Sequence, residues 1–120
     1  MEPRIEHTKF GAITIAGQTY SHDVLIGLDG TVRKRKKKLS KAIYGTSHTI
    51  SLDEAEYVYP EGAERLIVGT GQFGRVSLSD EAADFFERQG CQVDLLPTPK
   101  AAQAWNEARG AVAGLFHITC

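Results

Sequence analysis

Three glycines and two histidines are the residues of this chain whose types and positions most directly suggest a binding site. Residues 65–74 read Arg-Leu-Ile-Val-Gly-Thr-Gly-Gln-Phe-Gly, so a predicted apolar strand runs into a G-x-G-x-x-G loop. Because glycine has no Cβ atom, such a loop lets backbone amides approach an anionic group. Ligands of α/β proteins commonly bind at the carboxyl ends of strands. The predicted ligand-binding loop comprises Gly69, Thr70, Gly71, Gln72, Phe73 and Gly74.

A dinucleotide-binding fingerprint would require this glycine loop to lead directly into a helix. Here Arg75–Leu78 separates the loop from Ser79, the first residue that can cap the next helix. The acidic residue that binds ribose in such proteins lies at the end of the second strand, whereas Asp94 is followed by two leucines and is expected inside that strand. The loop therefore indicates a smaller ligand, or a tight turn without a ligand, rather than a dinucleotide.

A second polar segment, Gly45-Thr-Ser-His, precedes a predicted helix and contains Thr46, Ser47 and His48. If it faces the glycine loop, it supplies hydrogen-bond donors and an imidazole that titrates near neutral pH. We expect a crevice between the two loops, in which the amides of residues 70–73 hold an anion and His48 or Ser47 orients it. In this hypothesis Gly71→Val abolishes binding and leaves most of the fold intact. Turn and capping chemistry alone would also account for residues 46–48.

An enzyme that uses the same crevice is the alternative, with His48 or His117 as general base. His117 lies in a strand-like segment, residues 114–120, where a half-buried structural histidine is the simpler interpretation. No G-x-S-x-G nucleophile motif is present, and the adjacent Ser47 and His48 are not expected to form a catalytic dyad. We therefore assign no catalytic residue and expect a non-enzymatic domain that acts by protein contact or by recognising a small anionic ligand.

Half of the 14 Lys and Arg residues lie close together, although the net charge is only −1. A solvated strand and loop, with its charges outward, is the simplest interpretation of this basic patch. Aromatic residues for base stacking are not interleaved with it, so weak association with RNA is a lesser alternative. Docking to an acidic protein surface, such as the acidic face of a second copy in a homodimer, is another. The basic patch comprises Arg33, Lys34, Arg35, Lys36, Lys37, Lys38 and Lys41.

The remaining composition predicts no metal and no cofactor. The four histidines show no metal-ligand spacing, and Cys91 and Cys120 are too few for a zinc site or a disulfide framework. No apolar run approaches the roughly 18 residues of a membrane span. Residues 1–7 resemble neither a signal peptide nor a transit peptide, so we expect a cytoplasmic protein.

The elements that must position these residues form, by their spacing, a single α/β domain over residues 1–120. Residues 10–38 alternate short apolar runs with turn signals such as Asp29-Gly30 and predict an N-terminal antiparallel β-meander. A capping box at Ser51–Glu54, in which the Glu54 side chain reaches back to the Ser51 amide, starts a helix. Caps at Ser79 and Thr98 start two more, and the apolar runs 66–70, 91–96 and 111–119 predict strands between and after the helices. The prediction is a three-layer domain with a central mixed β-sheet and flanking helices.

Five short motifs, in this order, resemble one small family of unknown function that was first seen in archaeal structural surveys. They are Phe10-Gly-x-Ile13, Tyr20-Ser-His-Asp23, Gly45-Thr-Ser-His48, Gly69-Thr-Gly71 and Gly114-Leu-Phe-His-Ile-Thr-Cys120. The eukaryotic branches of that family include the adipogenesis-associated domain protein and a mitochondrial respiratory complex I assembly factor. The resemblance implies a three-layer α/β fold with a central mixed sheet and no established enzymatic activity. The basic patch and residues 45–48 indicate a prokaryotic-type member.

Overall fold

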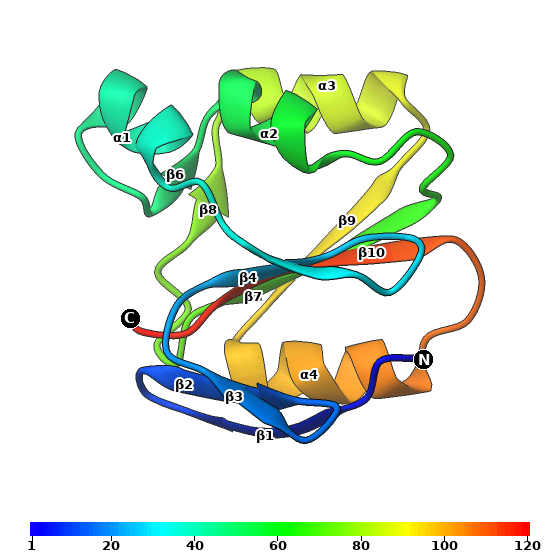
Figure 1. The fold of residues 1–120 in the computed structure, drawn as a ribbon. Coiled ribbons are helices and arrows are strands. Elements are labelled where there is room, and N and C mark those ends of the chain that lie inside the picture. Colours follow the sequence, from blue (N-terminus) through cyan, green and yellow to red (C-terminus); the bar gives the residue numbers. More distant parts are fainter.

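The computed structural model describes residues 1–120 and is built around a five-stranded mixed sheet with the strand order β5-β4-β10-β7-β9 (Figure 1). The central strand, β10, runs parallel to β7 and antiparallel to β4. β9 extends the parallel part beyond β7, and β5 forms a hairpin with β4. The strands are β4 (Val24–Ile26), β5 (Val32–Lys34), β7 (Arg65–Thr70), β9 (Gln92–Leu96) and β10 (Val112–His117).

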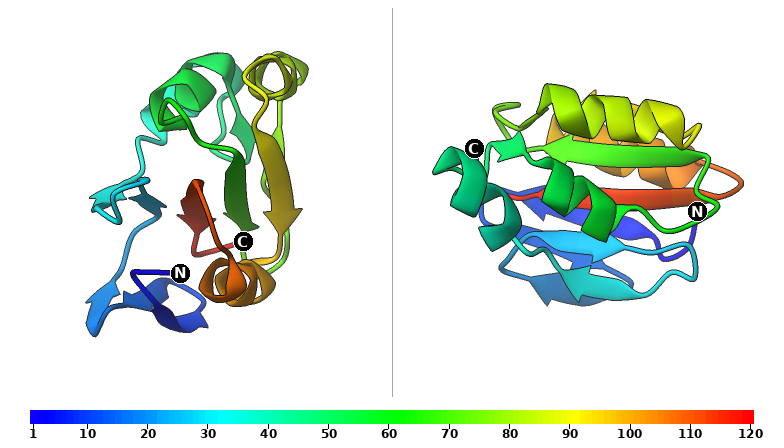
Figure 2. Two further views of the ribbon diagram at one scale, coloured as in Figure 1. Left: turned by 90° about the vertical axis from the view of Figure 1, so that its right-hand side faces the viewer. Right: turned by 90° about the horizontal axis from the view of Figure 1, so that it is seen from above.

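Layers on both faces of this sheet confirm the predicted three-layer α/β architecture (Figures 1 and 2). One face is covered by α2 (Leu52–Val58) and α3 (Asp80–Arg88), with α1 (Lys38–Tyr44) beside them. The short parallel pair β6 (Thr49–Ile50) and β8 (Ser77–Leu78) lies next to these helices. The other face is covered by α4 (Thr98–Glu107) and by a three-stranded antiparallel sheet, β1 (Ile5–Lys9), β2 (Ala12–Ile15) and β3 (Gln18–Tyr20). None of the four helices is long and apolar enough to cross a bilayer.

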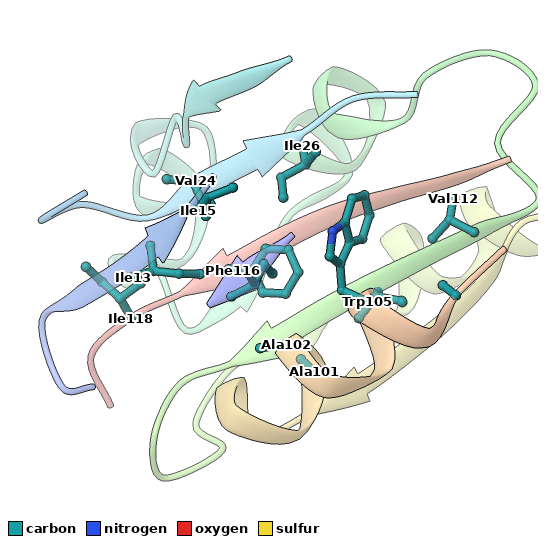
Figure 3. Close-up of a cluster of buried hydrophobic side chains, with 13 residues drawn as sticks. Ile13, Ile15, Val24, Ile26, Ala101, Ala102, Trp105, Val112, Phe116 and Ile118 are labelled. Atoms are coloured by element: carbon teal, nitrogen blue, oxygen red, sulfur yellow. The ribbon is translucent and has the colours of Figure 1, made fainter. Parts of the chain in front are cut away.

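Two apolar cores fill the spaces between the layers. Trp105 and Phe116 pack edge to face, with ring centroids 6.1 Å apart, in the core that lies against α4 and the three-stranded sheet (Figure 3). Leu115, the neighbour of Phe116, belongs to the opposite core together with Phe86 of α3. Successive residues of a strand point to opposite faces, so a strand covered on both faces must be apolar throughout. The uninterrupted apolar runs in β7 and β10 follow from this double burial.

Local signals in the sequence account for where the helices begin and end. The hydroxyls of Ser51 and Ser79 accept hydrogen bonds from the amides of Glu54 and Ala82, as expected for N-caps. The third start is displaced by one residue, because Pro97 occupies the N-cap position and Thr98 is the first helical residue. The Thr98 hydroxyl is buried and donates to the His117 carbonyl, so a tertiary contact replaces the expected capping bond.

The predicted meander over residues 10–38 is divided between two sheets. The meander β1–β2–β3 begins at Ile5, earlier than expected, and residues 10–11 form its first turn. The Asp29-Gly30 turn joins β4 to β5 as predicted, but that hairpin belongs to the central sheet. All three residues of β4 are buried, Val24 and Ile26 in one core and Leu25 in the other. The short elements α1, β6 and β8 were not predicted.

Candidate functional site

The carboxyl ends of β7 and β10 bring together the glycine loop and the two histidines singled out from the sequence. His117 ends β10 and is paired with Thr70, which ends β7. The ring of His48 lies edge to face with that of His117, at a centroid distance of 5.5 Å. A Cβ atom at Gly71 would come within 2.9 Å of the His117 ring. The predicted proximity of the two loops is therefore observed, and His117 lies between them.

No open crevice separates these loops, because none of the surface hollows is lined by residues 46–48 or 69–74. The amide of Gly71 donates to the Thr98 hydroxyl (2.9 Å), and the amide of Gln72 donates to the Thr119 carbonyl (2.7 Å). The amide of Phe73 donates to the Cys120 oxygen at 3.2 Å. The amides expected to hold an anion thus have partners within the chain. Ligand binding by residues 69–74 stays a prediction.

Gly71 is required by its surroundings. Its φ of +100° favours glycine, and a Cβ atom there would overlap with the carbonyl group of Cys120. The expectation that Gly71→Val leaves most of the fold intact is contradicted by this contact. The glycine is explained by the close approach of residues 119–120 to the loop, without any ligand.

A buried ion cluster, defined here as Asp23, Arg35, Glu54 and His117, lies beside these strand ends. The Arg35 guanidinium donates from Nη1 to Asp23 Oδ2 (2.9 Å) and from Nε to Glu54 Oε2 (2.6 Å). Its Nη2 donates to Glu54 Oε1 (3.0 Å) and to the Ser47 carbonyl (2.8 Å). Arg35 is only 3% exposed, so the expectation that every charge of the basic patch points outward is wrong for this residue.

Asp23 joins β10 to the basic patch. Its Oδ2 lies 2.7 Å from His117 Nδ1 and 3.6 Å from Lys37 Nζ, and its Oδ1 accepts the amide of Ile118 (3.0 Å). Burial favours the neutral acid, but the hydrogen bonds from His117 and Ile118 and the positive charges nearby outweigh it and lower the pKa of Asp23 to about 2. Asp23 is therefore ionised near neutral pH and acts only as an acceptor.

Glu54 has a different partner from the one its capping-box position predicts. Its amide donates to Ser51 Oγ (3.1 Å), but its side chain turns away to Arg35 and accepts the Ser40 hydroxyl as well. The Ser51 amide donates instead to Ser40 Oγ (3.0 Å). Half of the predicted capping box is therefore replaced by the ion cluster. The Glu54 carboxylate opposes desolvation of Arg35, and the pKa of the guanidinium is raised despite its burial.

The two histidines differ in their surroundings. His117 is buried, with Asp23 on Nδ1 and the Thr119 hydroxyl 3.1 Å from Nε2. His48 is partly exposed, and burial together with the neighbouring positive charges, His117 and Arg75 first among them, lowers its pKa. The neutral form of His48 is thereby favoured near neutral pH. Neither imidazole ring has both nitrogens hydrogen-bonded to backbone groups, so a general-base role of His48 or His117 stays a prediction.

A hollow of about 620 Å³ lies next to Asp23 and is lined by residues 21–23 and 34–38; we call it the basic hollow. Lys34, Lys36 and Lys38 are exposed, whereas Lys37 is partly buried and faces Asp23. Lys36 also lies over the Tyr57 ring, with Nζ 4.5 Å from its centroid. Of the remaining patch residues, Arg33 and Lys41 do not line the hollow. In the structure, four lysines of the basic patch and the buried Arg35 therefore line the hollow, and the other two cations lie outside it.

Sequence reasoning missed Asp23, Glu54, Ser40 and Thr119 as site residues. Asp23 and His117 are separated by 94 positions, and no local pattern links them. The Tyr20–Asp23 motif contributed to the family resemblance, but nothing in it indicates that its aspartate is buried. Thr119 could have been predicted, because it lies two residues after His117 and side chains two positions apart in an extended segment point to the same face.

The fold and this cluster define a three-layer α/β domain with ionisable residues buried at the carboxyl ends of its parallel strands. Residues 5–117 match the family described as protein of unknown function (DUF498/DUF598), and the chain belongs to this family. The family resemblance is thereby confirmed at that level; the relation to the two eukaryotic proteins stays a prediction.

Solved structures of similar proteins agree with this assignment. The conserved hypothetical protein PH1505 from Pyrococcus horikoshii is 32% identical, with a TM-score of 0.89, and the match covers 98% of this chain and 99% of that one. A protein called MT938 is also 32% identical, with a TM-score of 0.82 and 98% of each chain covered. A Bordetella pertussis protein described as a Mth938-like domain is 18% identical, with a TM-score of 0.64 over 97% of this chain and 85% of that one. This last likeness concerns the fold alone.

Proposed function

We propose that this domain binds a small anionic molecule in the basic hollow. The observation that carries the proposal is the lining: lysines at positions 34, 36, 37 and 38 surround a hollow whose one carboxylate, Asp23, is already paired with Arg35, Lys37 and His117. Because that carboxylate is neutralised within the protein, the net field of the hollow is positive. Such a field raises the local concentration of anions and favours their binding.

The residues predicted from the sequence support this site without lining it. Ser47 contributes its carbonyl to Arg35, and His48 packs on His117, which holds Asp23. Through these contacts residues 47 and 48 support Arg35 and Asp23, and Gly71 lies close to the His117 ring. Ligand contacts are then made by lysine ammonium groups and by Ser21 and His22, rather than by the amides of the glycine loop.

The experiment is a thermal-shift titration at low salt with inorganic phosphate, sulfate and nucleoside mono- and diphosphates. A ligand present at about 100 times its Kd adds about 2.7 kcal/mol to the free energy of unfolding. For a domain of this size that corresponds to a rise in Tm of about 10 °C. Sodium chloride at matched ionic strength separates specific binding from general screening.

Two pairs of variants decide whether the hollow is the site. Lys34→Glu with Lys38→Glu reverses two charges of the lining and should abolish the shift. Lys9→Glu with Lys100→Glu makes the same change of net charge at exposed lysines outside the hollow and should keep it. A shift that survives the first pair contradicts the proposal. If no small anion binds, protein contact becomes the better hypothesis, and steeply salt-dependent binding of an RNA oligonucleotide would favour the nucleic-acid alternative.

A further inference from the structure

Thr119, His117 and Asp23 form a continuous line of hydrogen bonds from the surface into the ion cluster. Asp23 Oδ2 lies 2.7 Å from His117 Nδ1, and His117 Nε2 lies 3.1 Å from the Thr119 hydroxyl. Asp23 and His117 are buried, whereas Thr119 is partly exposed. The line therefore has its hydroxyl at the solvent end and its carboxylate at the buried end.

The direction of each hydrogen bond follows from the chemistry of the groups. Asp23 is ionised and can only accept, so Nδ1 of His117 carries the proton that lies between them. In the neutral ring Nε2 then has a free lone pair, and the Thr119 O–H donates to it. A carboxylate that fixes the tautomer of a histidine, which in turn accepts from a hydroxyl, is the arrangement that activates a hydroxyl as a nucleophile.

Two backbone amides at Thr119 have no acceptor within the chain. The amides of Thr119 and Cys120 donate no hydrogen bond within the chain, whereas the neighbouring amide of Ile118 is bound to Asp23. The segment itself is held firmly, since the Ile118 and Thr119 carbonyls accept from Gly11 and Gln72 at 2.7 Å each. Unpaired amides adjoining a nucleophile are the groups that stabilise the oxyanion of a tetrahedral intermediate.

We propose that Thr119 is the nucleophile of an ester-hydrolysing site, with His117 as its general base and Asp23 as the residue that orients His117. The substrate class is a carboxylic ester small enough to reach a surface hydroxyl. This proposal shares Asp23 with the wall of the basic hollow, but its reacting groups, the Thr119 hydroxyl and His117 Nε2, do not line that hollow. Either activity can be present without the other.

The reaction balances with water as the only co-reactant. His117 Nε2 takes the proton of Thr119 Oγ1 as that oxygen bonds to the ester carbonyl carbon. The bond to the leaving alcohol then breaks, the alcohol leaves with the proton from His117, and an acyl ester of Thr119 remains. Water next gives a proton to His117 while its oxygen attacks the acyl carbon. Thr119 leaves with that proton, and the net change is ester plus water to acid plus alcohol.

The test combines turnover with the location of the covalent adduct. The purified protein is incubated with p-nitrophenyl acetate and, separately, with a fluorophosphonate, and the adducts are mapped by peptide mass spectrometry. We expect an adduct on Thr119, removed by alkaline hydroxylamine when it is an acetyl ester. Chance acetylation of lysines gives amides, which hydroxylamine leaves intact, so the two are distinguished on the same sample.

Four variants complete the test. Thr119→Ala should remove both adduct and turnover, while Thr119→Ser, which keeps a hydroxyl, should retain them. His117→Gln should lower the rate by about 10²–10⁴-fold, the usual contribution of a general base. Ser77→Ala removes an exposed hydroxyl outside this line of hydrogen bonds and should change nothing. Thermal unfolding shows which variants are folded.

Two results would overturn the proposal. One is a wild-type protein that forms no adduct on Thr119 with either reagent. The other is turnover in folded Thr119→Ala equal to that of the wild type. Because the adduct is mapped on the wild-type protein, the proposal can be decided even if one of the variants does not fold. Anion-induced thermal shifts in the basic hollow are measured separately, so loss of one activity does not imply loss of the other.

Discussion

Replacing Arg35 by methionine should destabilise the protein far more than replacing any other cation of the basic patch. Methionine fills a similar length of side chain, but it leaves Glu54 with the Ser40 hydroxyl as its remaining side-chain partner. Asp23 keeps Lys37 and His117 and loses less. Removing one member of a buried ion pair typically costs about 3–5 kcal/mol, because a buried charge is left uncompensated.

The magnitude can be expressed as a melting temperature. At about 2.1 cal/mol/K per residue, the entropy of unfolding of a chain of 120 residues is about 0.25 kcal/mol/K. A loss of about 3–5 kcal/mol therefore lowers Tm by about 12–20 °C. Lys34→Met is the matched control, since Lys34 is the exposed neighbour of Arg35 and should change Tm by no more than about 2 °C.

A second substitution tests the electrostatic origin of this loss. Glu54→Gln alone should destabilise, because it weakens the bonds to Arg35. In the Arg35→Met background the same change should stabilise, because it removes the uncompensated charge. Calorimetry of the four proteins gives this double-mutant cycle. The reasoning fails if Arg35→Met and Lys34→Met have the same Tm, or if Glu54→Gln changes the stability in the same direction in both backgrounds.

Three further predictions concern the pH response, the glycine loop and the core. The pKa of Asp23, lowered to about 2 from 3.8, implies that its ionisation contributes about 2 kcal/mol above pH 3.8, lost as the pH falls towards 2; an NMR titration midpoint near 3.8 for this carboxyl would contradict it. Gly71→Ala should lower the free energy of unfolding in urea by at least about 3 kcal/mol, because the new Cβ atom would overlap with Cys120. Gly62→Ala is the control: Gly62 also has a positive φ but no atom near its Cβ position, so the loss should be about 1 kcal/mol. Equal losses for the two variants would refute the role of the Cys120 contact. Trp105→Ala, which empties the core against α4, should cost about 3–5 kcal/mol, and a loss below about 1 kcal/mol in the same assay would show that the site is not closely packed.

Features that depend on neighbouring residues could be predicted from the sequence. The caps at Ser51 and Ser79 need only an amide three positions ahead, and both are observed. The left-handed turn at Gly90, with φ of +67°, depends only on the residue itself and directly follows the end of α3. The apolar runs of β7 and β10 reflect burial on two faces, which any three-layer arrangement provides. For these reasons the three-layer architecture could be predicted from the sequence.

The ion cluster could not be predicted because it depends on pairings across the fold. In the sequence Arg35 looks like Lys34 and Lys36, yet it alone meets carboxylates from positions 12 and 19 residues away. At Glu54 the contact with Arg35 replaces the predicted capping-box bond to the Ser51 amide. A charge-assisted bond to a buried guanidinium is stronger than a bond to a neutral amide, so the carboxylate turns to Arg35.

The position of β10 also determines when this sheet can form during synthesis. β10 separates the β4–β5 hairpin from the β7–β9 pair, so the two halves of the sheet share no edge until residues 112–117 have been made. A nascent chain that has not reached β10 therefore exposes two apolar strand edges that await the same partner. Such long-range pairing slows folding, and unpaired edges favour aggregation. We expect the β4–β5 hairpin and the β7–β9 pair to stay separate until β10 is available, so that β10 closes the sheet and, through His117, the ion cluster in one step.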